Sequence, residues 1–176
     1  GHCQRLAGYA AALGTTLALE PQEIAALRLG GFLHDIGKVG IPDRILLKPA
    51  RLTPDEYELM KQHTIIGDRL CGELRSLRHV RPIIRHHHER QDGSGYPDGL
   101  KGDEIPLLAQ IMGVVDVFDA LTTPRPYKDA LPVDLANEIF TPSDAEIERA
   151  ERILQAMEEA AKEGKGAVSL DGRLID

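Results

Sequence analysis

The apolar residues of this 176-residue chain recur at intervals of three and four positions, and no segment stands out as a strand. Residues 5–19 carry this spacing at Leu6, Tyr9, Ala10, Leu13 and Leu17, which predicts a helix. Aromatic residues make up only 4% of the chain and tryptophan is absent. A core built from aliphatic side chains favours helices over a β-sandwich. Because the length suffices for a substantial core, we expect an all-α domain.

Local signals predict where further helices begin and end. Pro21 suits the first turn of a second helix, which should end at His34 and Asp35 with Gly37 as its stop. Residues 38–52 then form a connection.

The segment from Thr53 to Glu56 forms a capping box, and the helix that it opens should carry His63 on its core-facing side. Two more helices are predicted over about residues 76–89 and 107–121, separated by a glycine-rich loop over residues 90–104. The helix over 107–121 is apolar almost all round, so we expect it to be buried.

Imidazole and carboxylate groups interrupt these apolar segments at His34, Asp35, His63, His87, His88 and Asp116. An unpaired buried carboxylate at Asp116 would cost several kcal/mol, so this side chain must be paired or bind a metal. One such histidine alone would be explained more simply as a hydrogen-bonded core residue. Their joint occurrence favours a metal centre, and the mixture of ligands suits iron, manganese or zinc. We expect His79 and His86 to lie outside this centre.

Three motifs that follow one another along residues 2–133 resemble those of the HD-GYP family, a branch of the HD phosphohydrolases. The first is Leu33 to Asp43, which contains His34-Asp35 and Gly37-Lys38. The second runs from His87-His88-Glu89 to Gly95-Tyr96-Pro97, and the third is Asp116 to Leu121 followed by Arg125 to Lys128. The resemblance implies an HD-domain helical bundle in bacterial second-messenger signalling. Its expected activity is hydrolysis of cyclic di-GMP to pGpG or GMP, or to both, by attack of a metal-bound hydroxide on the phosphodiester.

The same resemblance implies a role for individual residues. The metal ligands are expected to be His2, His34, Asp35, His63, His87, His88 and Asp116. Asp35 would bridge two metals, and Lys38 would act with it in catalysis by stabilising phosphate charge or assisting the leaving group. The substrate would be bound by Gly95, Tyr96, Arg125 and Lys128. We expect two or three divalent ions. The number is open because the glutamate that holds a third metal in some family members would lie before Gly1. Iron or manganese is expected in preference to zinc.

We expect two parts, a phosphohydrolase domain over residues 1–135 and a C-terminal helix and tail over residues 136–176. The tail resembles the C-terminal end of citrate lyase β-subunit-like and malyl-CoA lyases. About 40 residues cannot build a barrel of roughly 250, so we predict no lyase activity. An apolar stripe from Ala150 to Ala161 should instead pack on the domain or on a partner.

The net charge of −7 disfavours binding to polymeric nucleic acid or to anionic membranes. No apolar run is long enough to span a bilayer. Two cysteines without a motif indicate a reduced, cytoplasmic setting. The expected partners are cyclic di-GMP and regulatory signalling proteins, and a homodimer is compatible with the sequence. Three alternatives stay open: a broader HD phosphohydrolase, a catalytically weak cyclic-dinucleotide sensor, and a lyase-associated interaction module.

Overall fold

The computed structural model describes residues 1–124, 129–141, 147, 152, 168–170 and 173–175. The chain divides into two units, residues 1–130 and residues 131–176. The predicted substrate-binding residues Arg125 and Lys128 and most of the predicted C-terminal helix lie outside the described residues.

The first unit is helical, as the sequence predicts. Its elements are α1 (His2–Thr16), α2 (Pro21–Leu33), the 3₁₀ helix η1 (Ile36–Gly40), α3 (Asp43–Leu46), α4 (Pro54–Lys61), α5 (His63–Gly72), η2 (Arg75–Leu77), α6 (Arg81–His86), η3 (Gly102–Glu104) and α7 (Leu107–Thr122). Within the described part of the second unit, α8 (Val133–Phe140) is followed by β1 (Val168–Leu170) and β2 (Arg173–Ile175). These two strands pair antiparallel, with Val168 opposite Ile175. This short pair was not predicted, but the all-α expectation is confirmed for the first unit.

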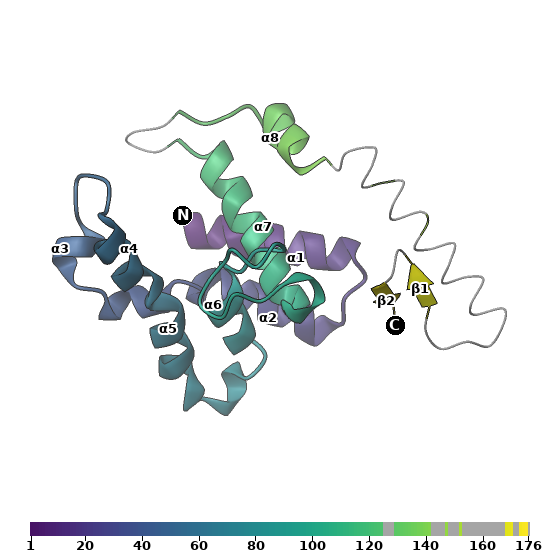
Figure 1. Ribbon diagram of the computed structural model, residues 1–176, viewed down its shortest axis with the longest axis horizontal. Coiled ribbons are helices and arrows are strands. Elements are labelled where there is room, and N and C mark those ends of the chain that lie inside the picture. Colours follow the sequence, from purple (N-terminus) through teal and green to yellow (C-terminus); the bar gives the residue numbers. More distant parts are fainter. Residues whose placement is uncertain (125–128, 142–146, 148–151, 153–167, 171–172, 176) are drawn as a thin grey trace. The chain divides into compact units, whose positions relative to one another are not determined.

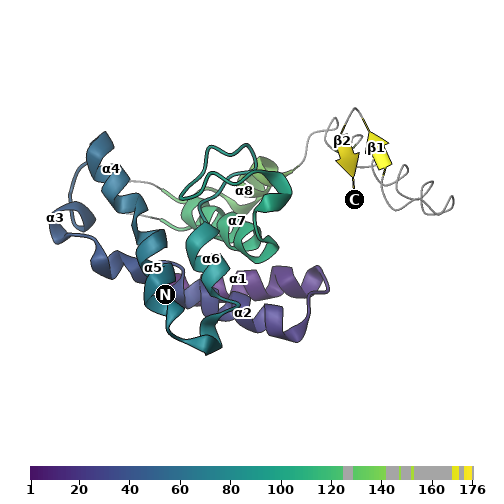
Figure 2. The same ribbon diagram turned by 60° about the horizontal axis from the view of Figure 1, so that its bottom comes forward.

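Helices α1 and α2 lie antiparallel to each other, and α7 packs against both (Figures 1 and 2). The core between them is aliphatic, and Leu6, Leu27, Ile83 and Met112 are completely buried. The first two helices approach closely at Gly31, where an added Cβ would lie 2.5 Å from the backbone nitrogen of Ala7. The absence of a side chain at this position therefore lets the helix pair close.

The second helix ends close to the predicted His34 and Asp35, but the predicted role of Gly37 as its stop is wrong. Gly37 does not stop α2, which ends at Leu33, because the chain turns at His34 and Asp35 and continues as η1. Gly37 is instead required by packing, since a Cβ there would lie 1.8 Å from the carbonyl oxygen of His63. The predicted connection over residues 38–52 also contains the short helix α3.

The helix opened by the Thr53 capping box does not continue through His63. The box itself is present, because the Glu56 amide donates to Thr53 Oγ1 (3.3 Å) and the Thr53 amide donates to Glu56 Oε2 (2.8 Å). Helix α4 ends at Lys61, however, and His63 begins α5. At the break, His63 Nδ1 donates a hydrogen bond to the carbonyl of Met60 (2.8 Å).

The two later helices also differ from expectation in extent and burial. Within the predicted 76–89 helix, only α6 is α-helical, and residues 76 and 77 belong to the 3₁₀ helix η2. Helix α7 has the predicted length but is not buried all round, because Leu107, Val114 and Val117 are exposed on one face. Among the described residues, no helix combines the length and apolarity that crossing a bilayer requires.

Candidate metal centre

Two groups of imidazole and carboxylate ligands lie together in the first unit. The first group contains Asp35, His63, His87 and His88, and the second contains His2, His34 and Asp35. Within each group, one ligand atom per residue lies within 4.8 Å of every other. Asp35 belongs to both groups, so the two candidate sites adjoin each other.

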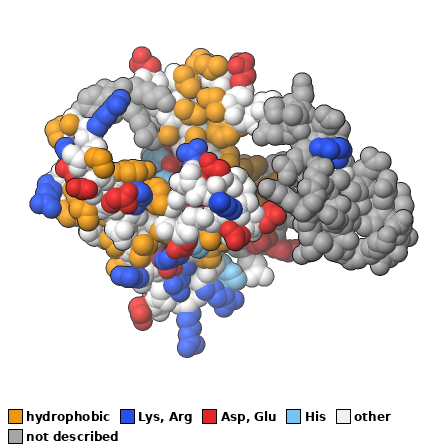
Figure 3. Space-filling view, in the orientation of Figure 1, with side chains coloured by type: hydrophobic (Ala, Val, Ile, Leu, Met, Phe, Trp, Pro, Cys, Tyr) orange, Lys and Arg blue, Asp and Glu red, His pale blue; other side chains and the backbone are white. Residues whose placement is uncertain are grey.

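The ligands come from the ends of four different helices. His2 begins α1, His34 and Asp35 directly follow α2, His63 begins α5, and His87 and His88 directly follow α6. Residues at a helix end leave the helical path, so side chains from separate elements can converge on one point. Figure 3 shows few histidine atoms on the face that it displays, which agrees with the burial of His34, His63 and His87.

Asp35 is placed to bridge the two groups. Its Oδ1 atom lies 3.4 Å from His63 Nε2, and its Oδ2 atom lies 3.3 Å from His34 Nε2. Lys38 Nζ donates a hydrogen bond to the same Oδ2 atom at 2.6 Å. Each carboxylate oxygen of Asp35 therefore faces a different ligand group. The ammonium of Lys38 contacts the oxygen that faces the second group.

The buried imidazoles fit a metal because they point unpartnered nitrogens into the centre. His63 Nδ1 donates to the carbonyl of Met60, and His87 Nδ1 lies within hydrogen-bonding distance of the carbonyls of Ile83 (3.2 Å) and Ile84 (3.0 Å). A carbonyl only accepts, so Nδ1 carries the proton and Nε2 keeps its lone pair. The Nε2 atoms of His63 and His87 are buried without a hydrogen-bond partner. Backbone anchoring of one ring nitrogen, with the other free, is the usual arrangement around a bound metal.

The pKa shifts keep most of the candidate ligands in the deprotonated form that binds a metal. Burial lowers the pKa of His63 and His87 and lowers that of His88 to about 4, so these imidazoles are neutral near pH 7. Burial alone would raise the pKa of Asp35, but the close approach of His34, together with Lys38, holds it well below its usual range. The pKa of His34 is raised, because its interactions with Asp35 outweigh its burial. Protonation of His34 would therefore compete with metal binding at this residue.

The predicted ligand Asp116 lies beside the second group but is not a member of either one. Its Oδ1 atom is 3.7 Å from His2 Nε2, and its side chain is 25% exposed. It is thus not the fully buried carboxylate that the apolar sequence of α7 suggests. Its role as a metal ligand stays a prediction.

The buried carboxylate of α7 is Asp119, which the sequence reasoning did not single out. It is 1% exposed, lies 2.7 Å from His2 Nδ1, and accepts hydrogen bonds from Arg5 Nε (2.5 Å) and Arg5 Nη2 (3.0 Å). Burial opposes its charge, but these bonds lower its pKa to about 2. Asp119 therefore orients the His2 ring, leaving Nε2 directed toward the site. The available signal was spacing, because Asp119 follows Asp116 by three residues and Arg5 follows His2 by three.

The glycine-rich loop is fastened to the end of α6 by Glu89, a second residue that the sequence reasoning missed. Its carboxylate accepts hydrogen bonds from the amides of Asp98 (2.7 Å), Gly99 (3.1 Å) and Leu100 (3.0 Å). Gly95 lies so close to this segment that an added Cβ would be 2.4 Å from the Cα of Glu89.

Tyr96 of this loop lies beside the first ligand group. Its ring stacks on that of His88, with centroids 4.8 Å apart and an interplanar angle of 30°. The peptide bond from Tyr96 to Pro97 is cis. Burial, with Tyr57 nearby, raises the pKa of the Tyr96 hydroxyl. Tyr96 is thus a neutral hydrogen-bonding group beside the first ligand group. The predicted role of its neighbour Gly95 in substrate binding stays a prediction.

The two histidines predicted to lie outside the centre have other partners. His79 is exposed, and its Nε2 atom accepts a hydrogen bond from Arg78 Nε (2.8 Å). His86 Nε2 lies 2.9 Å from Asp98 Oδ2. Neither residue belongs to a ligand group.

The HD domain family model matches residues 1–146, and the chain therefore belongs to the HD domain family. A cyclic di-GMP phosphodiesterase response regulator, RpfG of Xanthomonas campestris pv. campestris, is 47% identical over 135 residues, which are 76% of this chain and 36% of that protein. A cyclic di-GMP phosphodiesterase of Thermotoga maritima is 45% identical over 137 residues, covering 77% of this chain and 37% of the relative. This chain thus spans about a third of the length of these relatives.

A solved structure supports the fold. Bd1817, described as an HDG"Y"P protein from Bdellovibrio bacteriovorus, has a TM-score of 0.62 and 26% identity to this chain. The similarity covers 78% of this chain and 44% of Bd1817. The predicted membership of the HD phosphohydrolases is confirmed at the level of the HD domain. No finding supports the predicted likeness of residues 136–176 to lyases, and the family match extends into that segment, as far as residue 146.

Proposed function

We propose that the chain is the catalytic domain of a metal-dependent phosphodiesterase that hydrolyses cyclic di-GMP to pGpG, to GMP or to both. The observation that carries the proposal is the position of Asp35, whose two oxygens face two adjoining groups of histidines. The names of the two relatives support the choice of substrate.

The first group would hold one divalent ion through His63, His87, His88 and Asp35, and the second would hold another through His2, His34 and Asp35. Ions bound there would activate a water molecule and neutralise charge on the phosphodiester. The presence of two groups supports two ions, and the nitrogen and oxygen donors support iron or manganese, with zinc also compatible. Asp116, 3.7 Å from His2 Nε2, would join the second group as a further ligand.

Lys38 is the chain's own cation at the centre. Its ammonium pairs with Asp35 Oδ2 at 2.6 Å, and its side chain is 39% exposed, so the ammonium can also reach a substrate bound beside Asp35. There it would stabilise charge on the phosphate or donate a proton to the leaving oxygen. Arg125 and Lys128 are proposed to bind the phosphates, and Gly95 and Tyr96 to contact the rest of the substrate.

The test is turnover of cyclic di-GMP by the purified chain, reconstituted anaerobically with Fe(II) or Mn(II) and followed by chromatography. We expect His87→Ala to abolish turnover and lower the metal content, because His87 Nε2 faces the first group. His79→Ala is the matched control, since His79 is exposed and hydrogen-bonded to Arg78. Unchanged turnover and metal content in His87→Ala would contradict the proposal.

The domain division stays a proposal, with a phosphohydrolase domain over residues 1–135 and a C-terminal segment over residues 136–176. Regulatory signalling partners, a homodimer and a cytoplasmic location are also proposed on the sequence reasoning alone. Sedimentation of the purified chain tests the homodimer directly.

A further inference from the structure

A cluster of aromatic and cationic side chains adjoins the first ligand group, and two of its members have no role in the proposed chemistry. The cluster consists of Tyr57 and Lys61 of α4 and Tyr96 of the glycine-rich loop. The two tyrosine rings meet edge to face, with centroids 6.3 Å apart and an interplanar angle of 81°. Lys61 Nζ lies 5.1 Å from the centroid of the Tyr57 ring and 5.7 Å from that of Tyr96.

Tyr96 connects this cluster to the metal centre. Its ring stacks on His88 and lies 6.4 Å from the ring of His63, both of which belong to the first group. A substrate with its phosphodiester at that group would therefore place a neighbouring part of the molecule near Tyr57 and Lys61.

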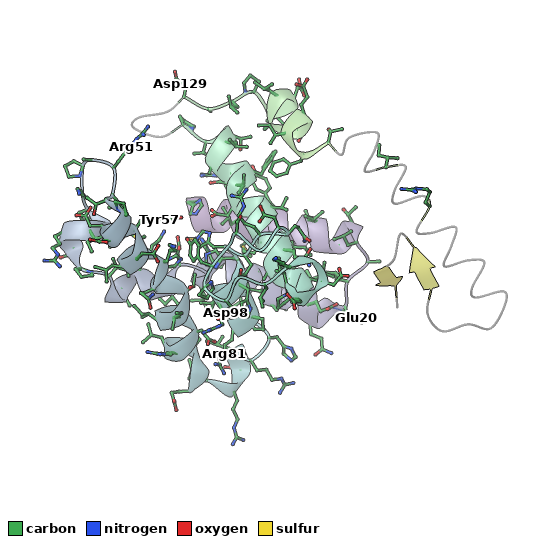
Figure 4. All side chains as sticks on the ribbon, viewed as in Figure 1. Glu20, Arg51, Tyr57, Arg81, Asp98 and Asp129 are labelled. Carbon is green, nitrogen blue, oxygen red and sulfur yellow. The ribbon has the colours of Figure 1, made fainter. Side chains whose placement is uncertain are left out.

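The exposure of Tyr57, beside the partly buried Lys61 and Tyr96, suits a ligand better than a purely structural role. Tyr57 is 47% exposed, and its side chain, labelled in Figure 4, projects from α4. An exposed tyrosine ring offers a face on which a nucleic acid base can stack. Its position is well fixed, because α4 begins with the Thr53 capping box and Lys48 Nζ pairs with Glu56 Oε2 at 2.5 Å.

Lys61 is held at the cluster by a second contact. Its ammonium lies 2.5 Å from Glu58 Oε1, one turn earlier on the same helix, and the Glu58 side chain is 67% exposed. The ammonium can donate three hydrogen bonds, so donors remain for a ligand after this pairing. The two rings and the carboxylate thus place a cation beside a stacking surface.

We propose that Tyr57, Lys61 and Tyr96 form a subsite that binds a guanine base of the substrate. The base stacks on Tyr57, and Lys61 donates hydrogen bonds to its O6 and N7 acceptors. Adenine has an amino donor at the position of O6, so the ammonium would meet a donor instead of an acceptor. The subsite therefore selects guanine over adenine, and this inference rests on the proposed function.

The experiment compares three substrates of the metal-loaded chain: cyclic di-GMP, cyclic di-AMP and bis(4-nitrophenyl) phosphate, which has no base. We expect Lys61→Met to lower kcat/KM for cyclic di-GMP roughly tenfold, equivalent to about 1.4 kcal/mol, mainly through a higher KM. The preference for cyclic di-GMP over cyclic di-AMP should fall by the same factor. Turnover of bis(4-nitrophenyl) phosphate should stay unchanged, since it reports on the metal centre alone.

Two further variants separate binding from folding. Tyr57→Ala should raise KM for both dinucleotides, whereas Tyr57→Phe should preserve stacking and KM. Arg69→Met on the exposed side of α5 is the control for loss of a cation. Thermal unfolding of each variant shows whether the fold is retained.

A value of kcat/KM for cyclic di-GMP within twofold of the original in Lys61→Met would overturn the inference, as would equal losses on all three substrates. Equilibrium binding of both dinucleotides to the metal-free chain is measured in parallel. If the original chain cleaves bis(4-nitrophenyl) phosphate but not cyclic di-GMP, the proposed function fails. Weaker cyclic di-GMP binding in Lys61→Met would then still support the guanine subsite, and unchanged binding would refute it.

Discussion

Replacing Asp119 with asparagine should destabilise the metal-free chain and weaken metal binding at the second ligand group. Asp119 is 1% exposed and makes three polar contacts, two with Arg5 and one with His2. An asparagine keeps the size of the side chain but loses the charge, and it turns an amide donor toward the donors of Arg5.

The magnitude follows from the exposure of the partners. Removing one member of a fully buried ion pair costs about 3–5 kcal/mol, because the remaining charge is left without compensation. The side chains of Arg5 and His2 are 38% and 36% exposed, so water can solvate them after the substitution. We therefore expect a loss of about 2 kcal/mol in the free energy of unfolding, near the lower values for hydrogen bonds to charged groups.

The assay is urea unfolding of the metal-free protein, which keeps stability separate from metal binding. Asp116→Asn is the matched control, because Asp116 lies one turn earlier on α7 and its side chain is 25% exposed. It should cost less than about 0.5 kcal/mol. In a separate titration, Asp119→Asn should lower metal affinity about 10- to 100-fold, as loss of an orienting partner usually does. Equal stability losses in the two variants, with metal affinity unchanged in Asp119→Asn, would refute the role assigned to Asp119.

Three further predictions concern packing, the loop and pH. Gly37→Ala should cost about 3 kcal/mol in urea unfolding, because its Cβ would lie 1.8 Å from the His63 carbonyl oxygen; an unchanged midpoint would contradict this. Glu89→Ala should leave three loop amides without their acceptor and speed proteolysis within residues 90–104, and a cleavage rate equal to the original would argue against it. The hydrogen bond and charge of Arg85 lower the pKa of Asp98 to about 2, so its stabilising contribution is complete above about pH 4 and is lost as the pH falls toward 2. Asp98→Asn should therefore flatten the loss of stability across that range, and an identical pH profile would exclude this contribution.

The sequence could indicate most of the candidate ligands because imidazole and carboxylate groups interrupt its apolar segments, whereas His2 was expected from the family resemblance alone. Pro21 and the Thr53 capping box locate the starts of two helices, and the structure has both starts at those positions. His34 lies at the predicted end of its helix, whereas His63, His87 and His88 were expected inside helices and lie at helix ends in the structure. A prediction at this level needs only local signals and the order of the motifs.

The features that could not be predicted depend on contacts between distant segments. The break between α4 and α5 accompanies the close approach of Gly37 to His63, which no local propensity encodes. Asp119 is explained only once α1 lies beside α7 and brings Arg5 and His2 to it. The exposure of Leu107, Val114 and Val117 on α7 could not be predicted either, because composition alone does not say which face of an apolar helix is covered by other elements.

The unpartnered imidazole nitrogens give the strongest physical reason to regard the centre as a binding site. Most buried polar atoms in proteins have a hydrogen-bond partner, and a missing partner costs about 1–3 kcal/mol. In the described residues, four of the five buried ring nitrogens without a partner belong to His34, His63 and His87, around a carboxylate whose pKa is depressed, and the fifth is Nδ1 of His86. A fold that needed only stability would have apolar residues at these positions. Because the ligands come from α1, α2, α5 and α6, a metal bound at Asp35 would also link the elements that form the core.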